Sequence, residues 1–197
     1  MTHRILPPDE ANLITLPGVG PCPRPVDIDQ AVTGFQRLKS LRAYRFGAGQ
    51  TIEGESEVDE VLITPVKGHV RLEIEGLHPM TADLGPGQIL YMPPDHAYRL
   101  TPAEDAIVAY GRALGTGAFA TTLRDDGAAA GKVLGLTRET LTAGASLALE
   151  AESLALVAEG GVTLSGASAG PLSVVAVGTG EASVTADAET ILWVYSA

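Results

Sequence analysis

The stretch that decides the fold is GQTIEGESEVDEVLITPVKG, residues 49–68. It is bounded by Gly49 and Gly68, and four acidic side chains alternate with other residues between them. These acids are Glu53, Glu55, Glu57 and Asp59. Because successive side chains of an extended strand point to opposite faces, one strand would put all four on a single face. The apolar run EVLITPV predicts a second strand, so the stretch as a whole indicates β-structure.

Short strands and turns continue on both sides of this stretch, over residues 40–113. The segment HVRLEIEG alternates with period two, which puts Val70, Leu72 and Ile74 on one face and Arg71 on the other. The chain has 23 Gly and 13 Pro but only 5% aromatic residues, a balance typical of short elements joined by tight turns. Strands of this length and spacing predict a sandwich or a barrel.

The pattern restarts after residues 114–131, which we interpret as a linker. The segment VLGLTRETLTAGASLAL resembles SLRAYRFGAGQTIEG, and AETILWVYSA resembles EDAIVAYGRA. The shared order of strands and glycine turns favours an internal duplication, although two unrelated β-rich stretches could also align in this way. The sequence thus predicts an extended Pro-rich arm at 1–30, an N-terminal barrel at 31–113 and a degenerate C-terminal barrel at 132–197.

The charge balance argues against several classes of partner. The chain has 13 Lys and Arg against 24 Asp and Glu, a net charge of −11, and an acidic surface repels phosphate backbones and anionic lipids. We therefore expect no nucleic-acid partner and no membrane partner. Cys22 is the single cysteine, so no internal disulfide can form, and the N-terminus lacks the apolar core of a signal peptide. These features predict a cytoplasmic protein.

The first copy resembles the cupins, because it carries both of their motif turns. Gly49 and Gly68 bound a stretch like the first cupin motif, and PGQILYMPPDHAY matches the second, with Gly87, five residues and then Pro93. The segments DEVLITPVKGHVRLEI and ILYMPPDHAYRL are also similar to the sugar isomerase cupins of uronate and inositol catabolism, which are two-barrel proteins. The resemblance implies an all-β fold of two cupin-type antiparallel β-barrels, or jelly rolls, in tandem.

The metal ligands of the family do not carry over. The family's ligand positions fall on Glu55 and Glu57, then on Val61 (or on Glu60 after a shift of one residue), and then on Tyr98, with His96 two residues earlier. Catalytic metals of this kind are usually held by two or three imidazoles. The chain has four histidines and none after residue 96. We therefore expect no metal and no cofactor.

Ionisable residues near both motifs could instead perform acid–base chemistry. Carboxylates packed closely raise one another's pKa, which is one way in which a general acid and base pair arises. The predicted catalytic residues are Glu57, Glu60, His96 and Tyr98, and the predicted substrate-binding residues are Arg45, Glu55 and Tyr91. Two alternatives remain for the acids, a hard cation held by their oxygens or a solvated rim. The alternative for the others is a rim histidine with two core tyrosines.

The function predicted from these residues is that of a metal-independent bicupin acting on a small polar metabolite by isomerase, cyclase or lyase chemistry. Two alternatives stay open, a non-catalytic or degenerate small-molecule-binding cupin and a metal-dependent sugar isomerase, so the sequence leaves open whether the chain is an enzyme. The second barrel has no histidine and is expected to be structural. The apolar strand ILWVYSA and the N-terminal arm predict a homodimer that binds a small-molecule ligand.

Overall fold

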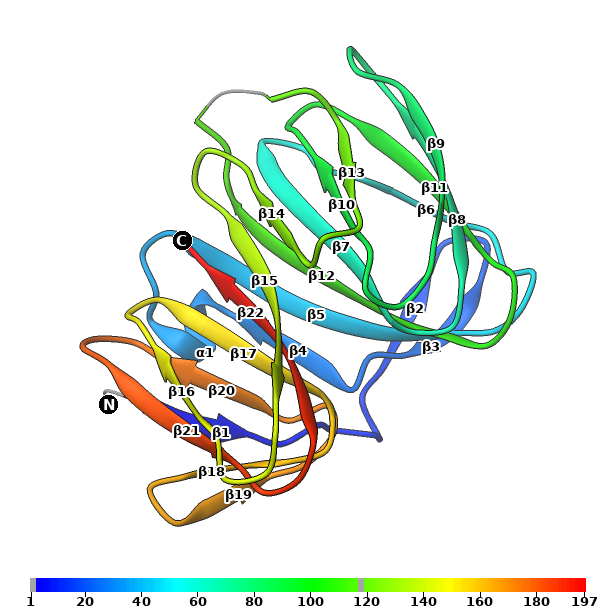
Figure 1. Cartoon of the computed structure of the whole chain (residues 1–197). Helices are drawn as coiled ribbons and strands as arrows, with labels where there is room; N and C mark the ends of the chain where they lie inside the picture. The colour runs from blue at the N-terminus through cyan, green and yellow to red at the C-terminus, as the bar shows by residue number, and fades with distance from the viewer. Residues whose placement is uncertain (1–2, 117–118) are drawn as a thin grey trace.

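The computed structural model describes residues 3–116 and 119–197, and strands account for most of its regular structure (Figure 1). Two six-stranded and two four-stranded sheets form two barrels, and a two-stranded hairpin lies near the N-terminus. The strands pair in the antiparallel sense throughout the described residues. The prediction of an all-β fold with two antiparallel barrels in tandem is confirmed.

The first barrel is built from a large and a small sheet. The large sheet contains β4 (Val26–Asp29), β5 (Leu38–Phe46), β7 (Asp59–Lys67), β10 (Ile89–Met92), β12 (Ala106–Leu114) and β13 (Thr122–Arg124). The small sheet contains β6 (Ile52–Glu55), β8 (Val70–Glu75), β9 (Met80–Leu84) and β11 (Ala97–Pro102). The hairpin of β2 (Leu13–Leu16) and β3 (Gly20–Pro23) packs beside β5.

The second barrel repeats this plan with shorter strands. Its large sheet contains β1 (His3–Leu6), β14 (Ala128–Ala130), β15 (Gly135–Leu141), β17 (Ser153–Glu159), β20 (Val174–Val177) and β22 (Thr190–Ser196). Its small sheet contains β16 (Ser146–Leu149), β18 (Val162–Leu164), β19 (Ala167–Ala169) and β21 (Ala182–Ala186). A single helical turn, α1 (Gln30–Thr33), connects β4 to β5 and begins at Asp29, whose side chain accepts a hydrogen bond from the Val32 backbone N–H.

The two barrels have the same strand order. The large sheets run β13–β10–β7–β12–β5–β4 and β1–β20–β17–β22–β15–β14, and the small sheets run β6–β11–β8–β9 and β16–β21–β18–β19. Each strand of the first barrel therefore has a counterpart in the second, and the predicted repetition of strand order is confirmed.

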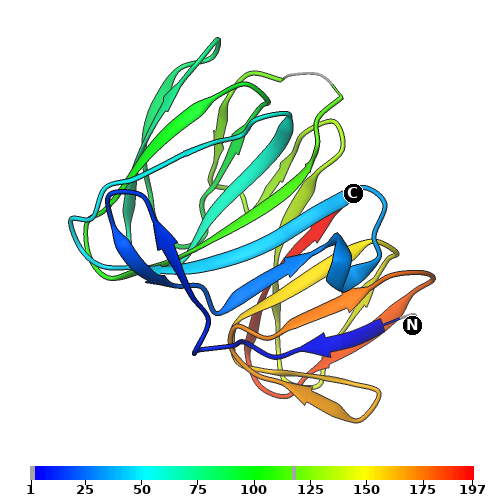
Figure 2. The same cartoon turned by 180° about the vertical axis from the view of Figure 1, so that it is seen from behind.

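The N-terminal segment and the linker each supply edge strands to both barrels. The segment predicted as an extended arm contains β1 to β4, which join three different sheets. Figure 2 shows β1 beside β20, and the register pairs His3 with Val177. In the predicted linker, β13 completes the first barrel and β14 completes the second. The division of the chain at the predicted boundaries stays a prediction.

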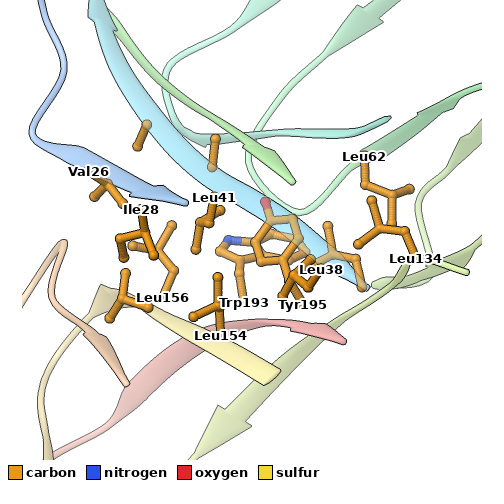
Figure 3. Close-up of a cluster of buried hydrophobic side chains, with 14 of the residues drawn as sticks. Val26, Ile28, Leu38, Leu41, Leu62, Leu134, Leu154, Leu156, Trp193 and Tyr195 are labelled. Carbon is orange, nitrogen blue, oxygen red and sulfur yellow. The ribbon is translucent and has the colours of Figure 1, made fainter. Parts of the chain in front are cut away.

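The barrels pack against each other through the outer faces of their large sheets. Figure 3 shows Trp193 and Tyr195 of β22 between the ribbons of the two sheets, with Leu38 and Leu41 of β5 close by. Trp193 is 2% exposed, and full burial of a large apolar side chain is worth roughly 1.5–3 kcal/mol. The strand that suggested a dimer interface thus lies largely inside one chain, and the homodimer stays a prediction.

The period-two pattern gives the correct faces on β8 but fails in the acidic stretch. Residues 70, 72 and 74 are buried in the first barrel and Arg71 is exposed, as predicted. The single acidic face predicted for residues 53–59 is wrong, because β6 ends at Glu55 and a turn follows. Glu57 in that turn has φ 53°, and Asp59 starts β7 with 1% exposure.

Over residues 3–116 and 119–197, no helix has the length and apolar character needed to cross a membrane.

Candidate functional site

A hollow of about 540 Å³ opens at the edge of the first barrel, beside β6. We call it the edge hollow. Its walls come from β6, β8, β11 and β12 and from the turn of the N-terminal hairpin. The side chains that shape it include Glu55, Glu57, Glu75, Ala97, Tyr98 and Arg112. Pockets that hold small molecules commonly measure about 300–1,000 Å³, so the edge hollow is large enough for a metabolite.

One wall of the edge hollow borders a rung of the small sheet on which the charges are paired. Arg99 on β11 lies opposite Glu53 on β6 and Glu73 on β8 in the strand register. Its guanidinium contacts both carboxylates, with Nη2 3.3 Å from Glu53 Oε1 and Nη1 3.5 Å from Glu73 Oε2. The cation on the middle strand therefore bridges the acids on the two outer strands.

The adjacent rung has the same acids but lacks the cation. Glu55 on β6 and Glu75 on β8 both lie opposite Ala97 on β11. Neither carboxylate forms an ion pair within the described part of the chain. Neighbouring strands lie about 4.8 Å apart, so the two flanking strands are roughly 10 Å apart across the short alanine. This rung is part of the lining of the edge hollow.

Arg112 joins the large sheet to the edge strand. It extends from β12, donates a hydrogen bond to the Glu55 backbone carbonyl, and places Nη1 3.6 Å from Asp59 Oδ2 and 3.8 Å from Glu57 Oε2. Asp59 is buried and is also bound by Lys39, whose Nζ lies 2.7 Å from Oδ1. Because Asp59 has two cationic partners, its negative charge is compensated and the arginine is held in place.

Tyr98 forms the inner wall of the hollow. It stacks on Tyr110 with ring centroids 6.0 Å apart, and a Cβ at Gly54 would lie 2.6 Å from its hydroxyl oxygen, so only glycine fits opposite it. Burial, followed by the proximity of Tyr44, raises the pKa of Tyr98 to about 12. The phenol is therefore protonated at neutral pH and acts as a hydrogen-bond donor rather than as a base.

Glu60 faces away from the edge hollow. It lies on the outer face of β7, and its carboxylate is fully buried. The carboxylate accepts hydrogen bonds from three consecutive backbone N–H groups, those of Lys132 at 2.9 Å, Val133 at 3.0 Å and Leu134 at 3.1 Å. This arrangement ties the start of the second barrel to the first, and it leaves the predicted catalytic role without structural support.

His96 is also occupied by backbone groups. Its Nδ1 lies 2.7 Å from the Pro94 carbonyl oxygen, and its Nε2 accepts a hydrogen bond from the His78 backbone N–H at 3.0 Å. These partners require a proton on Nδ1 and a free lone pair on Nε2. The imidazole is 3% exposed and does not line the edge hollow. It holds two loops together in the described structure.

The other predicted binding residues lie apart from one another. Arg45 forms an ion pair with Glu10 of the N-terminal segment, with Nη2 2.7 Å from Oε1. Tyr91 lies on the outer face of the large sheet, toward the second barrel, and is 2% exposed. Of the seven predicted site residues, the edge hollow brings together Glu55, Glu57 and Tyr98.

The residues at the cupin ligand positions do not fit a metal centre. Over residues 3–116 and 119–197, no three His, Cys, Asp or Glu side chains are grouped so that they could hold a metal ion. Glu57 lies in the turn after β6, Glu60 points into the contact between the barrels, and both ring nitrogens of His96 are engaged. We therefore derive no step through a metal.

Comparison with solved structures shows the same architecture. Matches include the bacterial pirin YhhW in complex with nickel(II) from Escherichia coli (TM-score 0.73, 14% identity, 98% of this chain and 97% of that one) and a putative glyoxylate-induced protein from Pseudomonas aeruginosa (0.78, 11%, 99% and 87%). An IolB-like protein from Salmonella typhimurium matches with TM-score 0.69 and 16% identity over 94% of this chain and 91% of that one.

The chain has a cupin fold. At these identities the likeness shows the fold and not the activity, so the closer resemblance to uronate isomerases is not shown. No protein-family model and no curated protein matches the chain.

The residues of the edge hollow that sequence reasoning missed include Arg112, Glu75, Ala97 and Arg99. A signal was available for Arg112, because it continues the period-two row of inward residues formed by Val108 and Tyr110. No signal in the sequence pairs Glu75 with Glu55, because their strands are separated by β11 and the pairing depends on the fold.

Proposed function

We propose that the protein is a small-molecule-binding cupin-fold protein whose edge hollow takes a small polar ligand with a cationic group, an ammonium or a guanidinium. The observation that carries this proposal is the contrast between two adjacent rungs of the small sheet. Arg99 bridges two acids on one rung, and Ala97 leaves the same space open on the next. A ligand cation above Ala97 would make the contacts that Arg99 makes above its own rung.

The remaining groups of the hollow support a polar ligand. Tyr98 offers a protonated hydroxyl, and the Arg112 side chain is 21% exposed while its guanidinium is anchored to the β6 backbone. A ligand with an acceptor group as well as a cation would therefore find partners for both groups in the hollow. Binding of such a ligand requires no proton transfer by Glu60 or His96, whose polar atoms are engaged with the backbone.

Acid–base catalysis of the isomerase, cyclase or lyase type is the second candidate. It is favoured by one observation, that Tyr98 and Glu57 both line the edge hollow beside Arg112. In that case Tyr98 would donate a proton and Glu57 would accept one. Loss of turnover in Tyr98→Phe, with ligand affinity retained, would favour this candidate over binding alone.

The binding proposal is tested with agmatine and cadaverine as probes, titrated into the purified protein by calorimetry at low ionic strength. The double variant Glu55→Gln/Glu75→Gln should weaken binding at least about tenfold, because both carboxylates of the open rung lose their charge. The matched control is Glu53→Gln/Glu73→Gln, which removes the same charge from the rung that Arg99 already fills. Glu53 also lines the hollow, but its carboxylate is paired with Arg99, so this variant should weaken binding less than the first. Equal loss in both variants, or no saturable binding of either probe, would contradict the proposal.

A further inference from the structure

A second hollow, of about 650 Å³, lies where the two barrels meet, between β13 and β14. We call it the seam hollow. Figure 1 shows these strands at the junction, with β10 on one side and β15 on the other. The register places Tyr91 of β10 opposite Thr122 of β13, and Ala128 of β14 opposite Thr137 of β15. The seam hollow shares no lining residue with the edge hollow.

The walls of the seam hollow are mainly apolar and carry little net charge. Phe119, Leu136 and the alanines of β14 supply apolar surface. Arg124 is the charged side chain of the lining, and its Nε lies 3.2 Å from Asp126 Oδ1 within an ion pair. An apolar ligand without a formal charge therefore suits the hollow better than an ion does.

One buried polar group lines the hollow without a partner. Tyr91 is 2% exposed, and its hydroxyl has no hydrogen-bond partner of normal geometry in the described structure. Its neighbour Glu60 directs its carboxylate at the N–H groups of residues 132–134. A buried hydroxyl without a partner is unfavourable, so a ligand acceptor that reaches it gains more than an exposed contact would give. The hydroxyl is covered by protein atoms in this structure, so the acceptor reaches it when a covering side chain moves.

The hydroxyl keeps its proton at neutral pH. Burial, with the charge of Glu60 as the second cause, raises the pKa of Tyr91 to about 12, and the nearby Phe119 backbone amide opposes the shift. A protonated phenol in an apolar wall donates a hydrogen bond, and its natural complement is a carbonyl or another neutral acceptor.

From the apolar walls, the paired charges and the unpartnered hydroxyl, we infer that the seam hollow is a second ligand site, which binds a neutral aromatic molecule bearing a hydrogen-bond acceptor. The aromatic part packs against Phe119 and the alanines of β14. The acceptor receives the Tyr91 hydroxyl. This site is independent of the cation site proposed for the edge hollow.

The test compares two probes that differ in one acceptor, 2-acetylnaphthalene and 2-ethylnaphthalene, titrated by ligand-observed NMR. The ketone should bind the wild-type chain at least about threefold more tightly than the hydrocarbon, because one net hydrogen bond corresponds to a factor of about 2 to 13 in affinity. In Tyr91→Phe the ketone should lose that advantage, and the hydrocarbon affinity should stay unchanged.

A matched control and a blocking variant complete the test. Tyr195 also has a buried hydroxyl without a partner, but it lies in the core between the barrels and does not line the hollow, so Tyr195→Phe should leave both affinities unchanged. Ala128 is exposed on the wall, so Ala128→Phe should fold normally and abolish binding of both probes. The inference is overturned if neither probe binds saturably, if the ketone has no advantage, or if binding persists in Ala128→Phe.

Discussion

Replacement of Glu60 by alanine should lower the free energy of unfolding by about 3–5 kcal/mol. The carboxylate accepts hydrogen bonds from the three N–H groups of residues 132–134 at 2.9, 3.0 and 3.1 Å, in a site with no solvent exposure. A buried donor left without an acceptor costs about 1–3 kcal/mol, so three donors set a range of about 3–9 kcal/mol. Water that enters the space left by the side chain offsets part of this cost and brings the value to the lower half of the range.

The measurement is urea denaturation followed by circular dichroism, with the slope of the transition compared between variants. Glu60→Gln should lower the free energy of unfolding by less than Glu60→Ala. Its amide oxygen still accepts hydrogen bonds, although its NH₂ group faces a backbone N–H donor. Glu55→Ala is the control, since this acid is exposed and makes no side-chain ion pair in the described residues, and it should change stability by less than about 0.5 kcal/mol. A loss below about 1 kcal/mol for Glu60→Ala would refute the anchoring role. Abolished ligand binding at unchanged stability would instead restore the functional role predicted from the sequence.

Three further predictions concern the stability of the folded chain. Gly131→Ala should destabilise the chain by about 1–3 kcal/mol, because its Cβ would lie 2.2 Å from Glu60 Oε2, whereas Gly170→Ala, with no atom within 4 Å, should be close to neutral in the same denaturation assay. His96→Phe should cost about 2 kcal/mol or more, because it leaves the Pro94 carbonyl and the His78 N–H unpaired, while calorimetric binding in the edge hollow should persist. Burial raises the folded-state pKa of Tyr98 from 10.0 to about 12, so its stabilising contribution is complete below about pH 10 and is lost as the pH rises toward 12. Tyr98→Phe should therefore reduce the fall of the urea midpoint over this alkaline range, and an unchanged fall would contradict the assignment.

The architecture could be predicted because it depends on local signals that repeat. The alternation of apolar and charged residues on β8 decides which side chains point into the barrel. The same order of strands and glycine turns recurs in the second half of the chain. Edge strands were harder to predict. The segment around His3 completes the second barrel by pairing with the strand that contains Val177, far along the chain, and no local pattern encodes such a pairing.

The site was predicted less well because it depends on where one strand ends. Extending β6 through Asp59 would put four acids on one face, but the turn at Glu57 separates them into exposed, turn and buried positions. The residues that complete the edge hollow come from β8, β11 and β12. Their convergence follows from strand order, which composition and spacing along the chain do not specify.

Glu60 near the start of β7 has two possible roles, as a displaced metal ligand or as a structural anchor. Which role applies depends on a shift of one residue in the alignment with the cupin motif. The first cupin motif places its glutamate at Val61 in this chain, and Val61 faces the interior of the first barrel. Glu60 is the adjacent residue, and because the side chains of a strand alternate, it faces the second barrel. The inward face at this point already holds Asp59, which is paired with Lys39 and Arg112, whereas outward the Glu60 carboxylate meets three backbone N–H groups at the start of the second barrel. Glu60, which a one-residue shift of the motif would make a ligand, is therefore better explained as the anchor that fixes one barrel to the other through the backbone of residues 132–134.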